Sequence, residues 1–253
     1  MTGISAVIIT KNEEANIKRC LDSLSFADEI IVVDSGSLDR TEEICKEYEN
    51  LSFLKTDWLG FGLTKQYGID KASNDWIFSI DADEEISAEL SEKLRTMIHD
   101  MDESNAYYIK RKTFYIGKFI NYCGWQRDYV LRLFNRKYGK FNSNMVHESV
   151  VHSGTIFKVD EPLYHYSYPD LEAHINKINL YTSIAARESF EKGKKTTIIS
   201  GFFHGFFRFF NMYLFNLGFL CGKEGLLLCM ISSFGVSLKY FKLWSLNRFC
   251  RKK

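Results

Sequence analysis

From residue 4 to residue 81, short runs of apolar and β-branched residues alternate with amphipathic stretches at helical spacing. Such alternation is typical of βαβ units wound around a mostly parallel sheet. A polar loop follows each expected strand, at the edge where open α/β sheets bind their ligands. The pattern therefore predicts an α/β fold with a site at the carboxyl edge of the sheet. We expect strands at 4–10, 29–34, 51–55 and 76–81, and helices at 13–24, 39–49 and 62–72.

The periodicity changes in the second half of the chain. After an expected helix at 88–101, aromatic residues alternate with polar ones over 106–116 and again around 129–134, which predicts antiparallel strands. Residues 172–191 then place apolar positions at helical spacing in a polar background. We expect a further amphipathic helix there.

Aromatic residues crowd the stretch 198–244, mixed with Lys, Arg and His. Two membrane spans would each need roughly 20 mainly apolar residues. His204 and Arg208 interrupt the first apolar stretch, however, and Lys223 with Glu224 separates it from the second. Large aromatics beside cationic residues are typical of helices that lie in the headgroup plane. We therefore expect a helical extension on a membrane surface, with a packed helical hairpin as the alternative.

Length, charge and cysteine usage narrow the possible functions. The 253 residues suffice for one large domain with an appendage. A net charge of +1 gives no global field that would attract nucleic acid. The six cysteines contain no C-x-x-C pair, which argues against a structural zinc site or a small disulfide framework and favours reduced thiols. The first expected strand begins at Ile4 without a basic leader or cleavage site, so we expect a cytoplasmic protein.

Two loops at the ends of expected strands carry residues suited to binding a nucleoside. Thr10 ends the first expected strand and Glu13 follows it, whereas Asp34 ends the second and Asp39 follows it. A carboxylate at a strand end can accept a hydrogen bond from a ribose hydroxyl or a base N–H. All four are candidates for substrate binding. Asp39 has a second interpretation, because it could instead cap the following helix.

Asp81 and Asp83 flank one small residue directly after the fourth expected strand. Hard carboxylate oxygens suit Mg²⁺ or Mn²⁺, which usually binds together with substrate phosphates. Most Asp-x-Asp triplets are solvated loops, but one at the end of a strand in a βαβ series predicts a metal site.

Taken in order, these segments resemble the nucleotide half of the family 2 glycosyltransferases. The resemblance covers about the first hundred residues and implies a GT-A fold, a Rossmann-like, mostly parallel sheet that binds a nucleoside diphosphate sugar. Gln66 departs from the Asn of many relatives. The matching sequences are Ile-Ile-Thr-Lys-Asn-Glu-Glu at 8–14, Val-Val-Asp-Ser-Gly-Ser at 32–37, Lys-Gln-x-Gly-Ile at 65–69 and Asp-Ala-Asp-Glu at 81–84.

The resemblance also implies roles for individual residues. Glu13, Asp34 and Asp81 would face the base and ribose of the donor. Asp83 would hold Mg²⁺ or Mn²⁺. Lys65 would face the diphosphate, where its positive charge would help the phosphate leave.

The second half resembles bacterial lipopolysaccharide core β-glucosyltransferases. Direct sugar transfer needs a carboxylate that takes the proton of the acceptor hydroxyl. The position of Glu148 resembles that of the acceptor-side acid in these relatives, so Glu148 is the candidate base. The segments that carry this resemblance are 125–128, 132–134, 146–149 and 162–166.

Four further residues have candidate roles. The resemblance makes His165 a candidate metal ligand, because GT-A enzymes often add a downstream His to the Asp-x-Asp metal. His147 would bind sugar or metal, or would be a hydrogen-bonded structural residue. Arg127 or Arg132 would brace the diphosphate, and either could equally form a salt bridge on a strand face.

The resemblance implies an inverting transferase that moves a hexose, glucose first, from a UDP-sugar to a membrane-associated glycan such as lipopolysaccharide core. Residues 1–104 would form the nucleotide-sugar-binding half of the GT-A domain, 105–169 the acceptor-binding half, and 170–253 the helical membrane-surface region. The protein would lie peripherally on the cytoplasmic face of the inner membrane of a bacterium.

Two other classes remain to be weighed. A sugar nucleotidyltransferase would need an N-terminal Gly-rich triphosphate loop, and residues 5–14 contain no glycine. An inactive membrane-associated adaptor is possible, because members of a fold can lose activity. Retention of Asp81, Asp83 and Glu148 argues against it.

Overall fold

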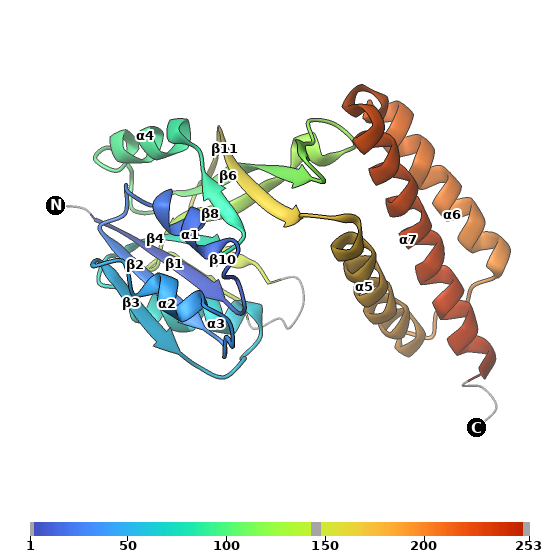
Figure 1. Ribbon diagram of the computed structural model, residues 1–253, viewed down its shortest axis with the longest axis horizontal. Coiled ribbons are helices and arrows are strands. Elements are labelled where there is room, and N and C mark those ends of the chain that lie inside the picture. Colours follow the sequence, from blue (N-terminus) through green and yellow to red (C-terminus); the bar gives the residue numbers. More distant parts are fainter. Residues whose placement is uncertain (1–2, 143–147, 250–253) are drawn as a thin grey trace. The chain divides into compact units, whose positions relative to one another are not determined.

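The computed structural model describes residues 3–142 and 148–249 (Figure 1). The chain divides into two units: residues 1–112 with 128–166 form the first, and residues 113–127 with 167–253 form the second. Each unit has its own core. The predicted functional divisions after residues 104 and 169 stay predictions.

The first unit is built on a mixed sheet with strand order β3-β2-β1-β4-β8-β6-β11-β5. Strands β3, β2, β1 and β4 are parallel, whereas β8 runs antiparallel to β4 and β5 runs antiparallel to β11. A separate hairpin joins β9 (Gly139–Phe141) and β10 (Val150–His152). The sheet strands are β1 Ile4–Thr10, β2 Glu29–Asp34, β3 Leu51–Lys55, β4 Trp76–Asp81, β5 Glu84–Ile86, β6 Ala106–Tyr115, β8 Tyr129–Asn135 and β11 Ile156–Tyr168.

Helices cover both faces of the parallel strands. The even-numbered positions of β1 pack with α1 and α4, whereas Val7 and Ile9 pack on the face that α3 covers. Every residue of β1 is buried, which is why its centre, from Ala6 to Ile9, is a run of apolar residues instead of an alternation. The helices are α1 Ile17–Asp22, α2 Thr41–Cys45, α3 Phe61–Asp70 and α4 Ala88–Met97.

The four predicted parallel strands are confirmed at their predicted residues. The four helices predicted before residue 102 are shorter in the structure, and α1 shows the reason. The carbonyl of Glu13 accepts the N–H groups of Asn16 and Ile17, so the chain first makes a turn and enters the helix only at Ile17. Apolar spacing continues through such turns and does not mark where helical hydrogen bonding begins.

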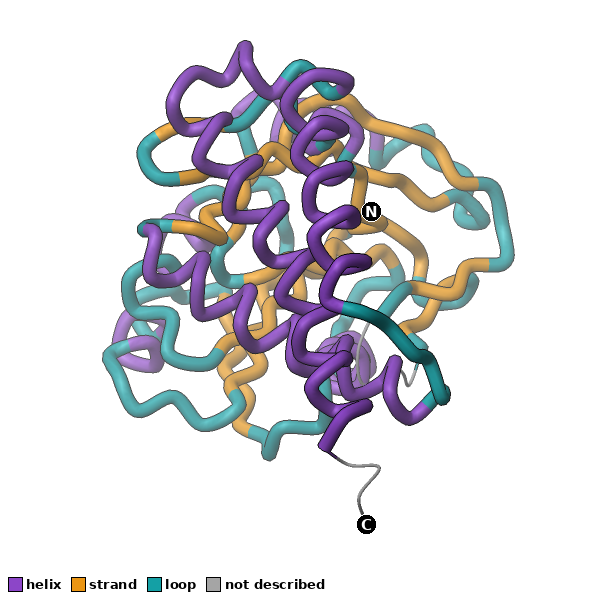
Figure 2. The backbone as a smooth tube through the Cα atoms, turned by 90° about the vertical axis from the view of Figure 1, so that its right-hand side faces the viewer, coloured by secondary structure: helices purple, strands orange, loops and turns teal. Residues whose placement is uncertain are grey.

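Three helices dominate the second unit: α5 (Leu171–Glu191), α6 (Ile198–Phe210) and α7 (Gly222–Phe249). Helix α7 packs against both of the others, as Figures 1 and 2 show. A Cβ at Gly205 would lie 2.0 Å from Ser237 Oγ, so only glycine permits this approach of α6 to α7. A π-helical turn (η2, Asn211–Phe215) and a 3₁₀ turn (η3, Gly218–Cys221) connect the two helices.

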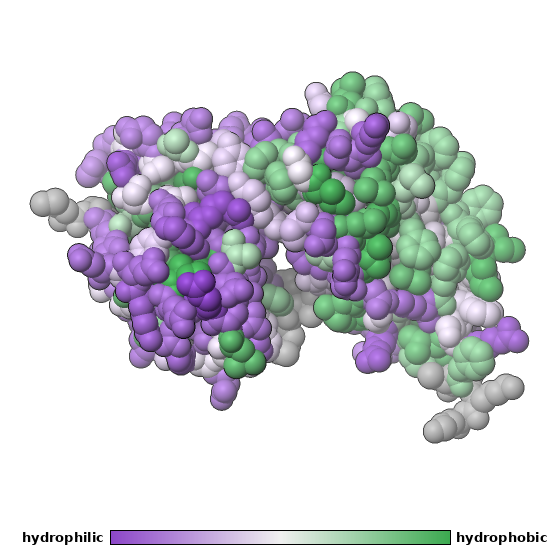
Figure 3. Space-filling view, in the orientation of Figure 1, coloured by the Kyte–Doolittle hydropathy of each residue, from purple (hydrophilic) through white to green (hydrophobic). Residues whose placement is uncertain are grey.

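Because α6 meets α7 through its glycines, its aromatic side chains point to solvent. Phe207 is 72% exposed, and the second unit shows a largely hydrophobic surface in Figure 3. By length and composition, the stretch Gly218–Phe249 could cross a membrane. The predicted helical extension is confirmed, and its position at a membrane stays a prediction. The exposed apolar residues of α6 are Ile198, Ile199, Phe202, Phe203, Phe206 and Phe207.

An aromatic cluster joins α5 to the ends of β6 and β11, which belong to the second unit. His174 Nδ1 lies 2.9 Å from the Tyr115 hydroxyl, and its ring packs against Tyr115 and Tyr168. Burial, followed by the nearby charge of Lys177, lowers the pKa of His174 to about 4. The imidazole is therefore neutral at ordinary pH.

We expect this buried histidine to make the protein less stable as the pH falls. Between pH 6.5 and about 4 the unfolded chain binds a proton at His174 that the folded protein does not, so stability present above pH 6.5 is lost toward pH 4. The full loss is about 3 kcal/mol. Urea unfolding of wild type and His174→Phe across this range measures it. An equal pH slope in both proteins would contradict the assignment.

Candidate active site

Three charged side chains meet at the carboxyl edge of the parallel strands. Asp81 ends β4, beside Thr10 at the end of β1, because these two strands are paired. Lys65 Nζ, from α3, lies 2.8 Å from Asp81 Oδ1. Arg132 Nη2, from β8, lies 2.5 Å from Asp81 Oδ2. Asp81 therefore has a cation on each carboxylate oxygen.

The same lysine also reaches the predicted base. Lys65 Nζ lies 3.5 Å from Glu148 Oε1, and the lysine side chain is only 3% exposed. Glu148 keeps 23% of its side chain exposed, so it is open to a substrate from one side. The structure thus brings Lys65, Asp81 and Glu148 together, although they are far apart in the sequence.

Buried ion pairs stabilise the positions of Asp81 and Arg132. Arg132 lies 2.6 Å from Glu84, which is completely buried, and Arg111 approaches the same carboxylate at 3.6 Å. The Glu84 Oε2 atom also accepts the N–H of Asp81 at 3.0 Å. Burial alone would raise the pKa of Asp81, but Arg132 and Lys65 hold it well below its ordinary value. Asp81 is therefore a permanent anion that orients two cations.

Asp83 and His165 converge on the neighbouring strand pair. Strand β5 pairs with β11 so that Glu84 lies opposite His165, and His165 Nε2 then lies 3.3 Å from Asp83 Oδ2. The other ring nitrogen, Nδ1, is buried without a partner in the described residues. No group of three His, Cys, Asp or Glu side chains within the described ranges has the geometry of a metal cage. Two protein ligands fit Mg²⁺ or Mn²⁺ that binds with substrate phosphates.

Polar side chains hold the two strand-end loops in shape, and that of Asp39 joins the loops to each other. Asp34 accepts from the N–H groups of Gly36 and Ser37, and it is buried. Asp39 accepts from the N–H groups of Thr41 and Glu14. Both aspartates therefore use some of their carboxylate lone pairs to hold the loop backbone. Their roles in binding a nucleoside stay predictions.

Two buried hydroxyl groups at this edge of the sheet have no hydrogen-bond partner among the described residues. Thr10 Oγ1 and Ser35 Oγ are buried, and neither makes a hydrogen bond within the described part of the chain. An unsatisfied buried hydroxyl costs stability unless a ligand supplies the bond. Ser35 was not predicted from the sequence, although its place after Asp34 in a strand-end loop was a usable signal.

Residues 5–161, more than half of the chain, match the family model described as glycosyl transferase family 2. The chain belongs to this family. The predicted resemblance is thereby confirmed, and the site at the strand ends is the candidate active site of a glycosyltransferase.

Relatives match along nearly the whole chain. An uncharacterized glycosyltransferase of Rickettsia typhi is 33% identical and covers 98% of this chain and 88% of its own. The lipopolysaccharide core biosynthesis glycosyltransferase LpsC of Rhizobium meliloti is 30% identical and covers 95% of this chain and 92% of its own. This glycosyltransferase therefore shares its second unit, as well as its sheet, with relatives.

Among solved structures, residues 1–349 of TarS from S. aureus in complex with UDP-GlcNAc have a TM-score of 0.52. The sequence identity is 13%, and the match covers 98% of this chain and 92% of TarS 1–349. At this identity the likeness shows the fold alone. It confirms the predicted GT-A-like architecture with its mostly parallel sheet.

Several residues predicted to bind substrate either lie in the second unit of this glycosyltransferase or bind other side chains of the protein. Arg127 ends a 3₁₀ turn, η1 (Trp125–Arg127), in the second unit and is exposed. Arg132 forms the salt bridge that the sequence left open as one of two possibilities. His147 lies outside the described residues. Glu13 accepts from the side chain of Asn16 at 2.8 Å. The substrate roles predicted for Arg127, Arg132, His147 and Glu13 stay predictions.

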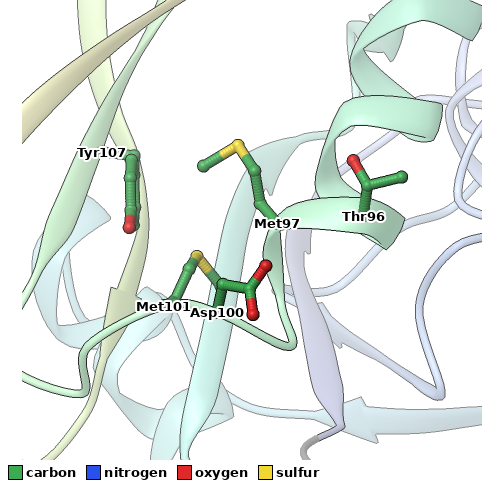
Figure 4. A pocket seen from close by; sticks show the side chains of 5 residues that line it. All are labelled: Thr96, Met97, Asp100, Met101 and Tyr107. Atoms are coloured by element: carbon green, nitrogen blue, oxygen red, sulfur yellow. The ribbon is translucent and has the colours of Figure 1, made fainter.

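A hollow of about 320 Å³ lies away from these residues. Met97, Met101 and Tyr107 line it, together with Thr96 and Asp100 (Figure 4). Tyr107 contacts Trp76, the first residue of β4, so the hollow lies at the amino end of that strand. Its lining offers one carboxylate and no cation, and it is not part of the active site.

Proposed function

We propose that this enzyme transfers a hexose, glucose first, from a UDP-sugar to a membrane-associated glycan acceptor such as lipopolysaccharide core, with inversion at the anomeric carbon. One observation carries the proposal: a partly exposed carboxylate, Glu148, shares a buried lysine with Asp81 at the edge where the sheet binds ligands. A candidate base, Glu148, and a fixed cation, Lys65, therefore lie next to each other at this edge.

The reaction is a single displacement. Glu148 takes the proton of the acceptor hydroxyl, whose oxygen forms a bond to the anomeric carbon. The bond from that carbon to the diphosphate oxygen breaks, and the nucleoside diphosphate leaves with the electron pair. Attack from the face opposite the leaving group inverts the configuration. Lys65 offsets part of the negative charge that develops at this edge.

Asp83 and His165 would hold Mg²⁺ or Mn²⁺, which would offset the charge of the leaving diphosphate. The unsatisfied hydroxyl groups of Thr10 and Ser35 would form hydrogen bonds with the UDP-sugar, next to Asp34. Arg132 would act through Asp81, because its ion pairs within the described residues are with Asp81 and Glu84.

The choice of acceptor rests on the relatives. LpsC of Rhizobium meliloti is described as a lipopolysaccharide core biosynthesis enzyme, and it matches both units of this chain. The segments 146–149 and 162–166 resemble core β-glucosyltransferases, which supports UDP-glucose as the donor. A lipid-linked acceptor also requires an enzyme that works at a bilayer.

The exposed face of α6 would supply that bilayer contact. Its aromatic side chains are turned to solvent, while Lys242 of α7 is held by Asn179, Thr182 and Ser183 of α5 and helps fix the helices to each other. Large aromatic residues on one helix face suit an in-plane, peripheral position. We place the enzyme on the cytoplasmic face of the inner membrane.

Phe207→Ala should weaken binding to anionic liposomes by about 10- to 100-fold, because burying one phenylalanine is worth roughly 1.5–3 kcal/mol. Co-sedimentation across a lipid titration measures the change. Phe157→Ala is the matched control, since Phe157 is 47% exposed on the first unit. Equal losses in the two variants would contradict an anchor on α6.

A donor panel tests the proposed function as a whole. Purified enzyme is mixed with UDP-glucose, UDP-galactose, UDP-N-acetylglucosamine or GDP-mannose, each with and without Mn²⁺, and release of the nucleoside diphosphate is measured. We expect UDP-glucose to be turned over fastest, with Asp83→Asn needing at least about tenfold more Mn²⁺ for half-maximal rate. Turnover of GDP-mannose alone, or full activity with chelator present, would contradict the proposal.

A further inference from the structure

Two exposed aromatic side chains lie at the start of α3, one on the loop before the helix and one at its first residue. Trp58 is 46% exposed and Phe61 is 42% exposed. Their rings contact each other edge to face, with centroids 4.7 Å apart and planes at 88°. Large aromatic rings usually bury their surface, so a packed pair left in solvent at the start of a helix is unusual and indicates a binding surface.

The first turn of α3 lies beside the predicted base. A Cβ at Gly62 would come within 2.5 Å of the Asn142 carbonyl oxygen and 3.3 Å of Glu148 Cβ, so the first turn of α3 lies directly against the segment that carries Glu148. One turn further along the same helix, Lys65 reaches the Glu148 carboxylate. The aromatic pair is thus attached to the acceptor side of the active site.

We propose that Trp58 and Phe61 form a platform that binds a sugar ring of the acceptor glycan next to the ring that is glycosylated. The inference rests on the proposed function, since it places this sugar beside the hydroxyl that Glu148 deprotonates. The apolar C–H face of a pyranose stacks on an aromatic ring, while the sugar hydroxyls remain available for hydrogen bonds.

Charge favours a sugar over a lipid surface at this position. Asp57 precedes Trp58, is exposed, and makes no ion pair with any residue that the structure describes. An unpaired carboxylate accepts hydrogen bonds from sugar hydroxyls and repels anionic headgroups. On α6, by contrast, Arg208 is the exposed charge among the aromatic residues, and it attracts such headgroups.

The test separates acceptor binding from donor chemistry. The acceptor is a lipopolysaccharide core oligosaccharide freed of its lipid, so membrane binding does not enter the measurement. Trp58→Ala and Phe61→Ala should each raise the KM for this oligosaccharide by at least about tenfold, with the KM for UDP-glucose unchanged. Trp58→Tyr should restore most of the affinity, because it keeps an aromatic face.

Leu63→Ala is the matched control. Leu63 is 43% exposed and stands two residues after Phe61, so it points to a different side of the helix. Its KM for the oligosaccharide should stay at the wild-type value. Signals from 5-fluorotryptophan give a readout without turnover: the ¹⁹F resonance lost in Trp58→Phe should shift when oligosaccharide is added.

Failure of the inference differs from failure of the proposed function. If wild type transfers glucose but Trp58→Ala keeps its KM for the oligosaccharide and the ¹⁹F signal does not move, the platform is wrong and the function stands. If Trp58→Ala instead loses liposome binding, the pair contacts lipid and the inference is overturned. A wild type that transfers no sugar refutes the proposed function itself.

Discussion

Replacing Glu148 by Gln is expected to lower the rate of sugar transfer by about 10²–10⁴-fold, the usual range for loss of a general base. The affinity for UDP-glucose should stay close to that of wild type. Glutamine keeps the shape and an acceptor oxygen for Lys65, which lies 3.5 Å from the carboxylate, but it cannot take a proton. Single-turnover transfer and equilibrium binding of UDP-glucose measure the two effects separately.

Glu92→Gln is the matched control for this change. Glu92 is exposed on α4 and makes no contact with the site, so its transfer rate should equal that of wild type. Near-normal transfer by Glu148→Gln would remove Glu148 from the mechanism. Loss of UDP-glucose binding in the same variant would show instead that the carboxylate holds the donor.

Replacing Arg132 by Met is expected to lower the free energy of unfolding by about 3–5 kcal/mol, because removing one partner of a buried ion pair leaves an uncompensated charge. The Glu84 side chain is completely buried, and among the described cations it would keep Arg111, at 3.6 Å. Urea unfolding monitored by far-UV circular dichroism measures the change. The double variant Arg132→Met/Glu84→Gln should recover part of the loss, since both charges are then absent.

An exposed ion pair gives the control for this prediction. Lys18 and Asp22 lie 3.2 Å apart on the surface of α1, and Lys18→Met should cost less than about 1 kcal/mol. If Arg132→Met costs no more than Lys18→Met, the buried network does not hold the site. If the double variant is no more stable than the single one, the loss has a cause other than the unpaired Glu84.

The parallel sheet could be predicted from the sequence because burial on both faces leaves a clear pattern. Strands such as β1 carry a run of consecutive apolar residues, and each strand is followed by a polar loop. The strand ends placed Asp34 and Asp81 at one edge, and in the structure they end β2 and β4, which both pair with β1. Helix ends were less predictable, because turns such as the one at Glu13 preserve the apolar spacing.

The contacts inside the site could not be predicted, because they join residues that are distant in the sequence. Arg132 on β8 meets Glu84 only because β8 pairs with β4 and lies near the start of β5. Nothing in the sequence around Glu84 marks it as a completely buried carboxylate. The exposure of Trp58 and Phe61 leaves no periodic signal in the sequence, and neither does the packing of α3 against the Glu148 segment.

The helical extension was predictable in kind but not in arrangement. The aromatic stretch indicated helices, yet its charged interruptions, Lys223 and Glu224, lie within the first turn of a single long α7. The glycines of α6 decide which side of that helix meets α7 and which side stays exposed. The choice of the exposed side therefore depends on the close approach of α6 to α7, and the apolar pattern of either helix does not reveal it.

The configuration of the transferred sugar tests the central claim most directly. UDP-glucose carrying ¹³C at its anomeric carbon is incubated with the enzyme, Mn²⁺ and lipopolysaccharide core acceptor from bacterial membranes, and the product is examined by NMR. UDP-glucose is an α-glycoside, so a single displacement assisted by Glu148 predicts a β-linked glucose on the acceptor. An α-linked product would contradict the account, because it requires retention and a different arrangement of the active-site carboxylates.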